Sequence, residues 1–383
     1  MSISFHVKPT KYFDPNREYL PCKPTILCYN NRIIECGLLK GAKYLVTIKD
    51  VARAVGVSTT TISNVIHGNV GRVSPEMVER IQDAIAHLQY VPNMSARALV
   101  NNASRIIGVI NHLVPLESGG FFQDPFHGAL LAGIEQTLRE RGYYLMVRTI
   151  DNVPELLSLL NNWNLDGLIL TGIFPTDFYE SLMAQKTPIL LIDSYIPNDQ
   201  VLQVRLEDQQ GGYIGTRHLL ENGHRDILFC GPPILEEGVL ARRFKGYCQA
   251  LAEFSVPVRM ENVYQREIGI EQGTALGREL AQRHDYTAIF ATADILAAGL
   301  ISGLAEAGRR VPEDISIVGF DDLNIARLTS PQLTTVHQDV VDKGVIAARM
   351  LIDALQGQES SAPRSVVLPV RLVSRQSVRR LDA

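Results

Sequence analysis

The first helical pattern in the chain is a pair of short apolar stripes separated by a glycine. Between Thr47 and Gly56, one face of a predicted helix carries the apolar residues Ile48, Val51, Ala52 and Val55. Thr47 can cap this helix, with the acid Asp50 three residues later as its partner in a capping box. Gly56 can adopt the positive φ of a tight turn, and Ser58 can then cap a second helix. The pattern predicts two helices that cross closely.

The second predicted helix has one apolar face and one polar face. Its apolar residues are Ile62, Val65 and Ile66. The opposite face carries short polar side chains that can reach base edges or phosphates in a major groove, namely Thr59, Thr60, Ser63 and Asn64. The pattern is typical of a DNA-binding helix-turn-helix. A helical hairpin with an ordinary solvated face is the alternative.

A third helix is predicted directly after this pair. Ser74 can act as its N-cap and Pro75 fits its first turn, and its apolar stripe consists of Met77, Ile81, Ala84, Ile85 and Leu88. The three helices make a small bundle. The following segment, Met94–Val100, has too few apolar residues to bury within its own chain, so we expect it to fold only against a partner.

From Arg105 onward, short apolar runs alternate with amphipathic helical patterns. The predicted strands are Ile106–Ile110, Tyr144–Val147, Gly167–Leu170, Ile189–Ile192, Ile227–Cys230, Ala288–Ala291 and Ile315–Gly319. The helical patterns between them include His127–Arg141, Gly212–Asn222, Arg243–Glu253, Gly273–Arg283 and Ile295–Ala307. This order requires parallel strands with helices on both faces of the sheet. Because about 270 residues are more than a single hydrophobic core usually holds, we expect two doubly wound α/β lobes.

Composition indicates the class of protein and the cellular compartment to be expected. The 383 residues, 46% apolar and 20% charged, fit a globular chain of two or three domains. No apolar run approaches the roughly 18 residues that span a bilayer, and the N-terminus lacks the apolar region of a secretory signal. We therefore expect a cytoplasmic protein without membrane contact. Its five scattered cysteines fit reduced thiols better than disulfide bridges or zinc.

The net charge of −4 does not by itself indicate nucleic-acid binding. The segment Tyr44–Arg105, however, carries six Lys or Arg residues against four acids. A mildly basic head attached to an acidic body would have to gain its affinity for DNA from dimerisation and geometry more than from bulk charge.

Residues 1–45 carry no sustained periodicity. We interpret them as an extension that is disordered or, because the helical pattern begins cleanly at Val46, absent from a natural protein whose translation starts there. A cysteine-containing regulatory tail is the alternative interpretation.

Ligands of open parallel sheets bind beyond the carboxyl ends of the strands. The residues that follow the predicted strands are Phe126, His127, Phe174, Asp193, Arg243, Asp294, Phe320 and Asp321. Aromatic faces combined with charged side chains suit a polyhydroxylated ligand such as a sugar. The alternatives are a carboxylate that caps the next helix, a phenylalanine of a lobe core, a surface ion pair and a structural histidine.

Motifs of catalysis and of cofactor binding are missing from the sequence. No Ser/His/Asp triad or Cys/His pair can be placed on the loops after the predicted strands. The sequence also contains no Walker loop, no GxGxxG after the first strand and no ligand spacing typical of zinc. We expect no enzymatic activity, no cofactor and no metal.

These residues together resemble the lactose/galactose repressor (LacI/GalR) family of bacterial transcription regulators. The resemblance runs from about Val46 to Val378 and rests on the ordered motifs TIKDVA, GVSTTTISNVIHG, RVS, YVPN with ARAL, RIIGVI, LLENGHRDI, RFKGY, FATADILAAG, RRVPEDISIVGFDD and PQLTTVHQD. It implies a homodimer on a pseudo-palindromic double-stranded DNA operator. It also implies a small-molecule effector, expected to be a carbohydrate, between two periplasmic-binding-protein-like lobes.

The resemblance also implies roles for single residues. The DNA-binding positions are Thr47, Ser58, Thr59, Thr60, Thr61, Ser63, Asn64, Asn93, Ala96 and Leu99. Leu99 matches a hinge-helix wedge in the minor groove, which suits an apolar side chain that opens a base step. The effector positions are Asp193, Arg243 and Asp294, with Phe126 and Phe174 near others.

The same resemblance sets the expected domains. They are a helix-turn-helix domain over 46–92, a hinge helix and linker over 93–104, and an effector-binding and dimerisation domain over 105–383, with one lobe from 105–204 and 334–362 and the other from 206–331 and 364–383. The chain departs from the family pattern at Ala293, where an asparagine is common, at Glu207-Asp208, and in a longer loop at His67–Arg72. These departures leave the effector unidentified. We expect a regulator, most often a repressor in this family, with a cytoplasmic solute-binding protein as the alternative.

Overall fold

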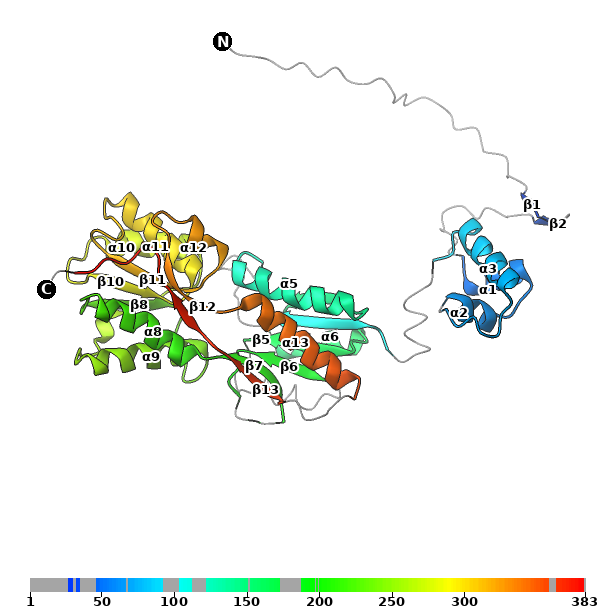
Figure 1. The fold of residues 1–383 in the computed structure, drawn as a ribbon, viewed down its shortest axis with the longest axis horizontal. Helices are drawn as coiled ribbons and strands as arrows, with labels where there is room; N and C mark the ends of the chain where they lie inside the picture. Colours follow the sequence, from blue (N-terminus) through cyan, green and yellow to red (C-terminus); the bar gives the residue numbers. More distant parts are fainter. Residues whose placement is uncertain are drawn as a thin grey trace, which may run out of the picture. The chain divides into compact units, whose positions relative to one another are not determined.

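The computed structural model describes residues 46–66, 68–91, 103–111, 122–150, 152–172, 187–196, 198, 200–357 and 363–381, and the backbone of two short strands at 27–29 and 32–34. The chain divides into two compact units, Met1–Asn93 and Met94–Ala383 (Figure 1). Each unit has its own hydrophobic core and is described by itself.

Three helices form the core of the first unit. They are α1 (Ile48–Val55), α2 (Thr59–Ile66) and α3 (Pro75–His87). Each helix contributes a fully buried residue to one cluster: Val51, Ile62 and Ile81. The predicted three-helix bundle is confirmed.

The helices begin at the predicted capping residues. The Asp50 carboxylate accepts hydrogen bonds from the backbone N–H and the hydroxyl of Thr47, at 2.9 and 2.6 Å. Ser58 Oγ accepts from the backbone N–H of Thr61 at 3.1 Å. Such contacts pair polar groups that the ends of a helix leave without an intrahelical partner. After α1, Gly56 has a φ of 80°, which is the left-handed turn that its position predicted.

Two segments depart from the expectation for the N-terminal region. The sequence of residues 1–45 predicts no regular structure, yet β1 (Leu27–Tyr29) and β2 (Arg32–Ile34) pair antiparallel. The expectation is wrong for these strands, which are too short to carry a readable alternation of side chains. The hinge helix expected over 93–104 lies outside the described residues except for its last two.

The second unit begins with a six-stranded parallel sheet, which we call the first lobe. Its strand order is β13-β7-β6-β5-β3-β4. The strands are β3 (Ile106–Asn111), β4 (Tyr144–Thr149), β5 (Gly167–Thr171), β6 (Ile189–Ile192), β7 (Leu202–Leu206) and β13 (Ser365–Leu368). Helices α5 (Pro125–Glu140) and α13 (Val340–Leu355) pack on one face and α6 (Val153–Asn162) on the other (Figure 1).

The second lobe contains another six-stranded sheet, with the order β14-β12-β11-β10-β8-β9. Its strands are β8 (Ile227–Gly231), β9 (Val263–Gln265), β10 (Ala288–Ala291), β11 (Ser316–Asp321), β12 (Thr334–His337) and β14 (Arg371–Val373), of which β14 alone runs antiparallel to its neighbour. Helices α10 (Ile270–Leu280), α11 (Asp294–Glu306) and α12 (Asn324–Leu328) cover one face, and α8 (Asp208–Glu221) and α9 (Val239–Glu253) the other.

The chain crosses between the lobes three times. The crossings follow β7, β12 and β13, since each of these strands ends a run of residues in one sheet. The expected ranges assign 334–337 to the first lobe and 364–368 to the second, whereas β12 pairs within the second sheet and β13 within the first, so both crossings come a few residues later. A strand's sheet depends on which distant strand it pairs with, and a local sequence pattern does not carry that information.

All seven predicted strands are present. The strands that were not predicted include β7 and β12, whose sequences, LQVRL and TTVH, mix polar residues into positions that are mostly buried. The two doubly wound lobes are confirmed.

Candidate DNA-reading helix and effector cleft

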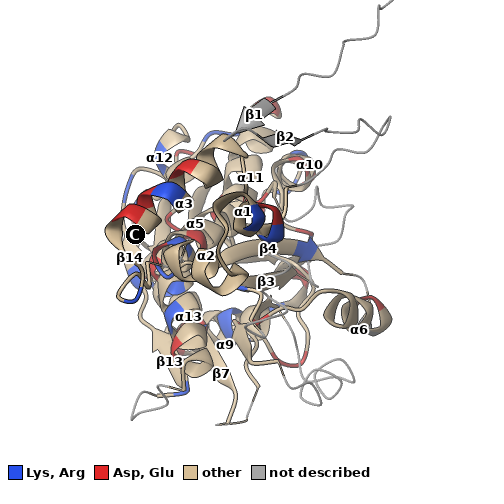
Figure 2. Cartoon of the chain, turned by 90° about the vertical axis from the view of Figure 1, so that its right-hand side faces the viewer, with Lys and Arg blue, Asp and Glu red and all other residues tan. Residues whose placement is uncertain are grey.

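The polar face of α2 is open to solvent. Ser58, Thr59 and Thr60 are exposed, while Thr61, Ser63 and Asn64 are half-buried. The helix contains no charged residue. The Lys and Arg residues of the described head lie outside α2: Lys49 and Arg53 are on α1, Arg72 is in the turn before α3, and Arg80 is on α3 (Figure 2 colours these residue types blue). Base-edge contacts can thus come from short hydroxyl and amide side chains, with phosphate contacts from the flanking helices.

Three predicted DNA-binding residues lie outside the described residues. They are Asn93, Ala96 and Leu99, all in the expected hinge helix. Phe174, an expected effector residue, lies outside them as well.

The ends of the strands in the two lobes are joined by a set of hydrogen-bonded polar residues, which we call the bridging cluster: Asp193, Asp208, Arg243, Asp321, Gln338 and Lys343. It brings together two of the predicted effector residues, Asp193 and Arg243, with four others. Asp193 follows β6 in the first lobe, and Asp321 ends β11 in the second.

Lys343, on α13, connects the first lobe to the crossing after β12. Its side chain is fully buried, and its Nζ donates to both oxygens of Asp193, at 2.8 and 3.1 Å, and to Oε1 of Gln338 at 2.8 Å. Gln338 in turn donates from Nε2 to Oδ1 of Asp321 at 2.6 Å. A continuous chain of hydrogen bonds therefore runs from one lobe to the other.

Arg243, near the start of α9, forms the other half of the cluster. Its Nε donates to Asp208 Oδ1 at 2.8 Å, and its Nη1 donates to the backbone carbonyl of Thr292 at 2.5 Å. The guanidinium carbon lies 3.4 Å from the centroid of the Phe320 ring. On the first lobe, the hydroxyl of Tyr195 hydrogen-bonds Asp208. This arrangement holds a guanidinium over an aromatic face at the strand ends.

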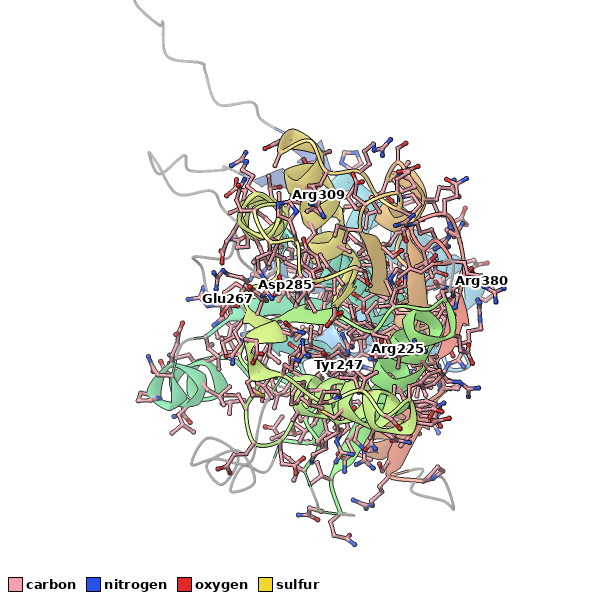
Figure 3. All side chains as sticks on the ribbon, turned by 90° about the vertical axis from the view of Figure 1, so that its left-hand side faces the viewer. Arg225, Tyr247, Glu267, Asp285, Arg309 and Arg380 are labelled. Carbon is pink, nitrogen blue, oxygen red and sulfur yellow. The ribbon has the colours of Figure 1, made fainter. Side chains whose placement is uncertain are left out.

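Close packing between α8 and α9 holds Arg243 in place. A Cβ atom on Gly212 would lie 2.0 Å from the Arg243 carbonyl oxygen, and one on Gly246 would lie 2.0 Å from that of Gln209. Further along α9, the hydroxyl of Tyr247, labelled in Figure 3, donates to the Ile227 carbonyl at 2.8 Å. Glycines at the crossing of α8 and α9 thus allow the close contact between the two helices that fixes the position of Arg243.

Phe126 lies beside the cluster. Its ring centroid is 5.5 Å from Lys343 Nζ, and its backbone N–H donates to Asp124, which caps α5, at 2.9 Å. His127, the next residue, is buried, and burial lowers its pKa to about 4. It is therefore a neutral histidine at pH 7.

The carboxylates of the cluster are strongly affected by burial. Burial raises the pKa of Asp193, and the Lys343 ammonium acts in the opposite direction. Burial also raises the pKa of Asp321 well above its ordinary value, with Arg243 opposing the shift. Both residues have positive φ angles, 57° and 111°, which non-glycine residues rarely adopt. Backbone strain of this kind gathers at ligand-binding sites.

Two buried polar atoms at the strand ends have no hydrogen-bond partner among the residues that the structure describes. They are Nδ2 of Asn111, which ends β3, and Oγ1 of Thr292, which follows β10; the residues are 1% and 0% exposed. An unpaired buried polar group costs free energy, so such atoms mark places where a ligand can bond. The sequence prediction did not include these two residues because it considered only charged and aromatic side chains. Neutral polar residues at the carboxyl ends of strands are equally well placed to bind a ligand.

Asp294 differs from the other predicted effector residues. It is fully buried at the start of α11, where one oxygen accepts from Thr335 Oγ1 at 2.6 Å and the other from the backbone N–H of Leu323 at 2.8 Å. Both partners belong to the second lobe. Its expected contact with the effector stays a prediction, and the geometry favours Asp321 for that role.

Two negative findings concern the described residues alone. No helix among them is long and apolar enough to cross a membrane. Nor do they contain a group of three or more His, Cys, Asp or Glu side chains that could hold a metal ion.

Comparisons with known proteins agree with both units. The profile of the lacI family of bacterial regulatory proteins matches residues 47–93, and that of the periplasmic binding protein-like domain matches residues 216–378. The HTH-type transcriptional repressor PurR of Actinobacillus pleuropneumoniae is 33% identical over 346 residues, which span 88% of this chain and 100% of the relative. The HTH-type regulator DegA of Bacillus subtilis is also 33% identical, over 88% of this chain and 99% of DegA.

Solved structures give the same result. The lac repressor dimer bound to operator and the anti-inducer ONPF has a TM-score of 0.74 and 26% identity, and the match covers 87% of this chain and 99% of the repressor chain. The transcriptional regulator CelR in complex with cellobiose has a TM-score of 0.65 and 29% identity, over 87% and 99% of the two chains. The chain belongs to the LacI family of bacterial regulatory proteins and is a DNA-binding transcriptional regulator with a ligand-binding domain.

Proposed function

We propose that this regulator is a repressor whose effector is a sugar or sugar derivative that binds at the bridging cluster, between the lobes. The observation that carries the proposal is that polar groups from both lobes converge there. A guanidinium on an aromatic ring, a carboxyl group and unpartnered amide and hydroxyl atoms are the groups that hold vicinal hydroxyls when water is excluded.

Named relatives support this class of ligand. One solved relative is a complex of CelR with cellobiose, and another is a LacI family regulator from Enterococcus faecium with bound ribose. The latter has a TM-score of 0.64 and 31% identity, and the match covers 72% of this chain and 100% of that one. In our proposal, Arg243, Asp321, Asn111 and Thr292 contact the effector directly, and Lys343 and Gln338 hold the lobes.

The DNA contacts follow the same reasoning. We assign base and phosphate contacts to the exposed face of α2, from Ser58 to Asn64, and minor-groove insertion to Leu99. We further propose that the protein acts as a homodimer on a pseudo-palindromic operator in the cytoplasm, and that it has no enzymatic role.

A gel-shift experiment tests the proposal. Purified full-length protein is incubated with segments of the DNA upstream of its own coding sequence, with and without a panel of neutral mono- and disaccharides. We expect one segment to be bound specifically and one sugar to change that affinity. Specific DNA binding that no sugar alters would contradict the effector class, whereas sugar binding without any DNA binding would contradict the regulator.

A further inference from the structure

A cavity, which we call the hinge cavity, lies where the chain crosses between the lobes. Its volume is about 680 Å³. Its lining includes Glu207 at the crossing between β7 and α8, Val367 and Val370 at the crossing between β13 and β14, and Arg242 on α9. The cavity adjoins the bridging cluster at Asp208 but is lined by different cationic residues. A volume of this size suits a small organic ligand.

Two arginines lie over the same aromatic ring in this cavity. The guanidinium carbon of Arg242 is 4.2 Å from the centroid of the Tyr195 ring, and that of Arg205 is 5.9 Å from it. Both residues and the tyrosine line the cavity. Cation–π contacts with one ring therefore hold the two guanidinium groups close together.

Neither arginine donates a hydrogen bond to a carboxylate among the described residues. Arg242 forms an ion pair with Glu237 at 3.8 Å, and Arg205 donates to the Ser365 hydroxyl at 2.9 Å. The Nε atoms of both arginines are buried without a hydrogen-bond partner. Asp208 cannot neutralise them, because its oxygens bind Arg243 and Tyr195. The cavity therefore contains two guanidinium groups that no carboxylate among the described residues holds by a hydrogen bond, although Glu207 and Asp208 are also in its lining.

We propose that the hinge cavity binds a phosphorylated small molecule, whose phosphoryl oxygens pair with Arg205 and Arg242. Guanidinium groups bind phosphate oxygens through paired N–H donors, and a doubly charged group matches two cations. Because the lining comes from both lobes and from two crossings, a ligand there favours one orientation of the lobes. The site is thus a second regulatory input, separate from the effector site of the bridging cluster.

Isothermal titration of the full-length protein with pyrophosphate tests this proposal, at constant ionic strength and with citrate as a carboxylate comparison. We expect saturable binding that weakens about tenfold or more in Arg242→Gln and in Arg205→Gln, since each loses charge-assisted hydrogen bonds. Arg217→Gln is the matched control. Arg217 also lies over a tyrosine ring, at 5.9 Å, but pairs with Glu221 at 2.8 Å.

The results of this titration decide whether the site exists and whether it prefers phosphoryl groups to carboxylates. Arg242 is half exposed, so its variant is expected to fold, and circular dichroism of each variant verifies this. Absence of pyrophosphate binding in the wild type, or equal binding in the wild type and Arg242→Gln, would overturn the site. Citrate binding that equals pyrophosphate binding and depends on the same arginines would overturn the phosphoryl assignment in favour of a carboxylate.

Discussion

At the scale of single residues, two aspartates that follow strands in the same lobe have different surroundings. Asp294 is enclosed, with both oxygens bonded inside the second lobe. Asp321 has a φ of 111° and hydrogen-bonds the crossing residue Gln338. The sequence predicted that carboxylates stand at the strand ends, but their direction depends on backbone angles and partners that a pattern does not contain.

The buried carboxyl of Asp294 predicts a pH dependence of stability. Burial raises its pKa to about 7 from 3.8. The folded protein therefore binds more protons than the unfolded chain between these values, so this group's contribution falls as pH rises through the window. We expect Asp294→Asn, which mimics the protonated acid, to be close to the wild type near pH 4 and more stable by a few kcal/mol above pH 7.

Urea denaturation between pH 4 and 8 measures this difference. Glu313→Gln, an exposed acid of the same lobe, serves as the control and should follow the wild type at every pH. A constant difference between Asp294→Asn and the wild type would show that the carboxyl does not titrate in this range.

Thr60 is the exposed residue of α2 best suited to test base recognition. Thr60→Ala should weaken specific operator binding by about 1–3 kcal/mol, because a hydrogen bond to a base edge is lost, and should leave binding to random DNA nearly unchanged. Fluorescence anisotropy with both DNAs measures the two affinities. Gln82→Ala, at an exposed position of α3, is the control. Equal losses on both DNAs would count against base recognition.

At the scale of elements, close helix contacts position the site. The α8–α9 pair depends on Gly212 and Gly246, since an added Cβ would meet backbone atoms of the opposite helix at 2.0 Å. Backbone atoms cannot move aside as a flexible side chain can. The position of Arg243 therefore depends on glycines that carry no chemistry themselves.

Replacing a glycine at this crossing should be costly. We expect Gly212→Ala to lower the free energy of unfolding by about 1–3 kcal/mol or more, as overpacking does. Gly128→Ala is the matched control: Gly128 is also helical, but a Cβ there would meet nothing within 4 Å. It should stabilise the protein by up to about 1 kcal/mol through helix propensity. Equal effects of the two substitutions in thermal unfolding would contradict the packing argument.

The sequence predicts elements well where burial is complete. Strands such as β5 and β6 are continuous apolar runs, and the head helices have both stripes and caps. The sequence does not predict a buried strand that contains polar residues, such as TTVH of β12. Nor does it predict to which sheet a strand belongs when its partner is distant in the chain, as for β13. The same limit explains why Lys343 was missed. Its partner Asp193 is 150 residues away in the chain.

At the scale of the whole molecule, we propose that the bridging cluster couples ligand binding to the orientation of the lobes. Its hydrogen bonds run from Asp193 through Lys343 and Gln338 to Asp321. A ligand can shift the lobes only by as much as it binds one orientation better than another. In this proposal, an effector at the cluster controls the affinity of the head for its operator.

The most direct test is an operator titration by fluorescence anisotropy with and without the identified sugar, for the wild type and for the double variant Asn111→Ala, Thr292→Val. Neither side chain is charged, and Asn111 Nδ2 and Thr292 Oγ1 have no hydrogen-bond partner among the described residues, so their substitution breaks no ion pair. For the double variant, we predict the same operator affinity as the wild type without sugar. The sugar concentration that gives half of the response should be higher by about tenfold or more. A sugar response identical to that of the wild type would contradict the proposal.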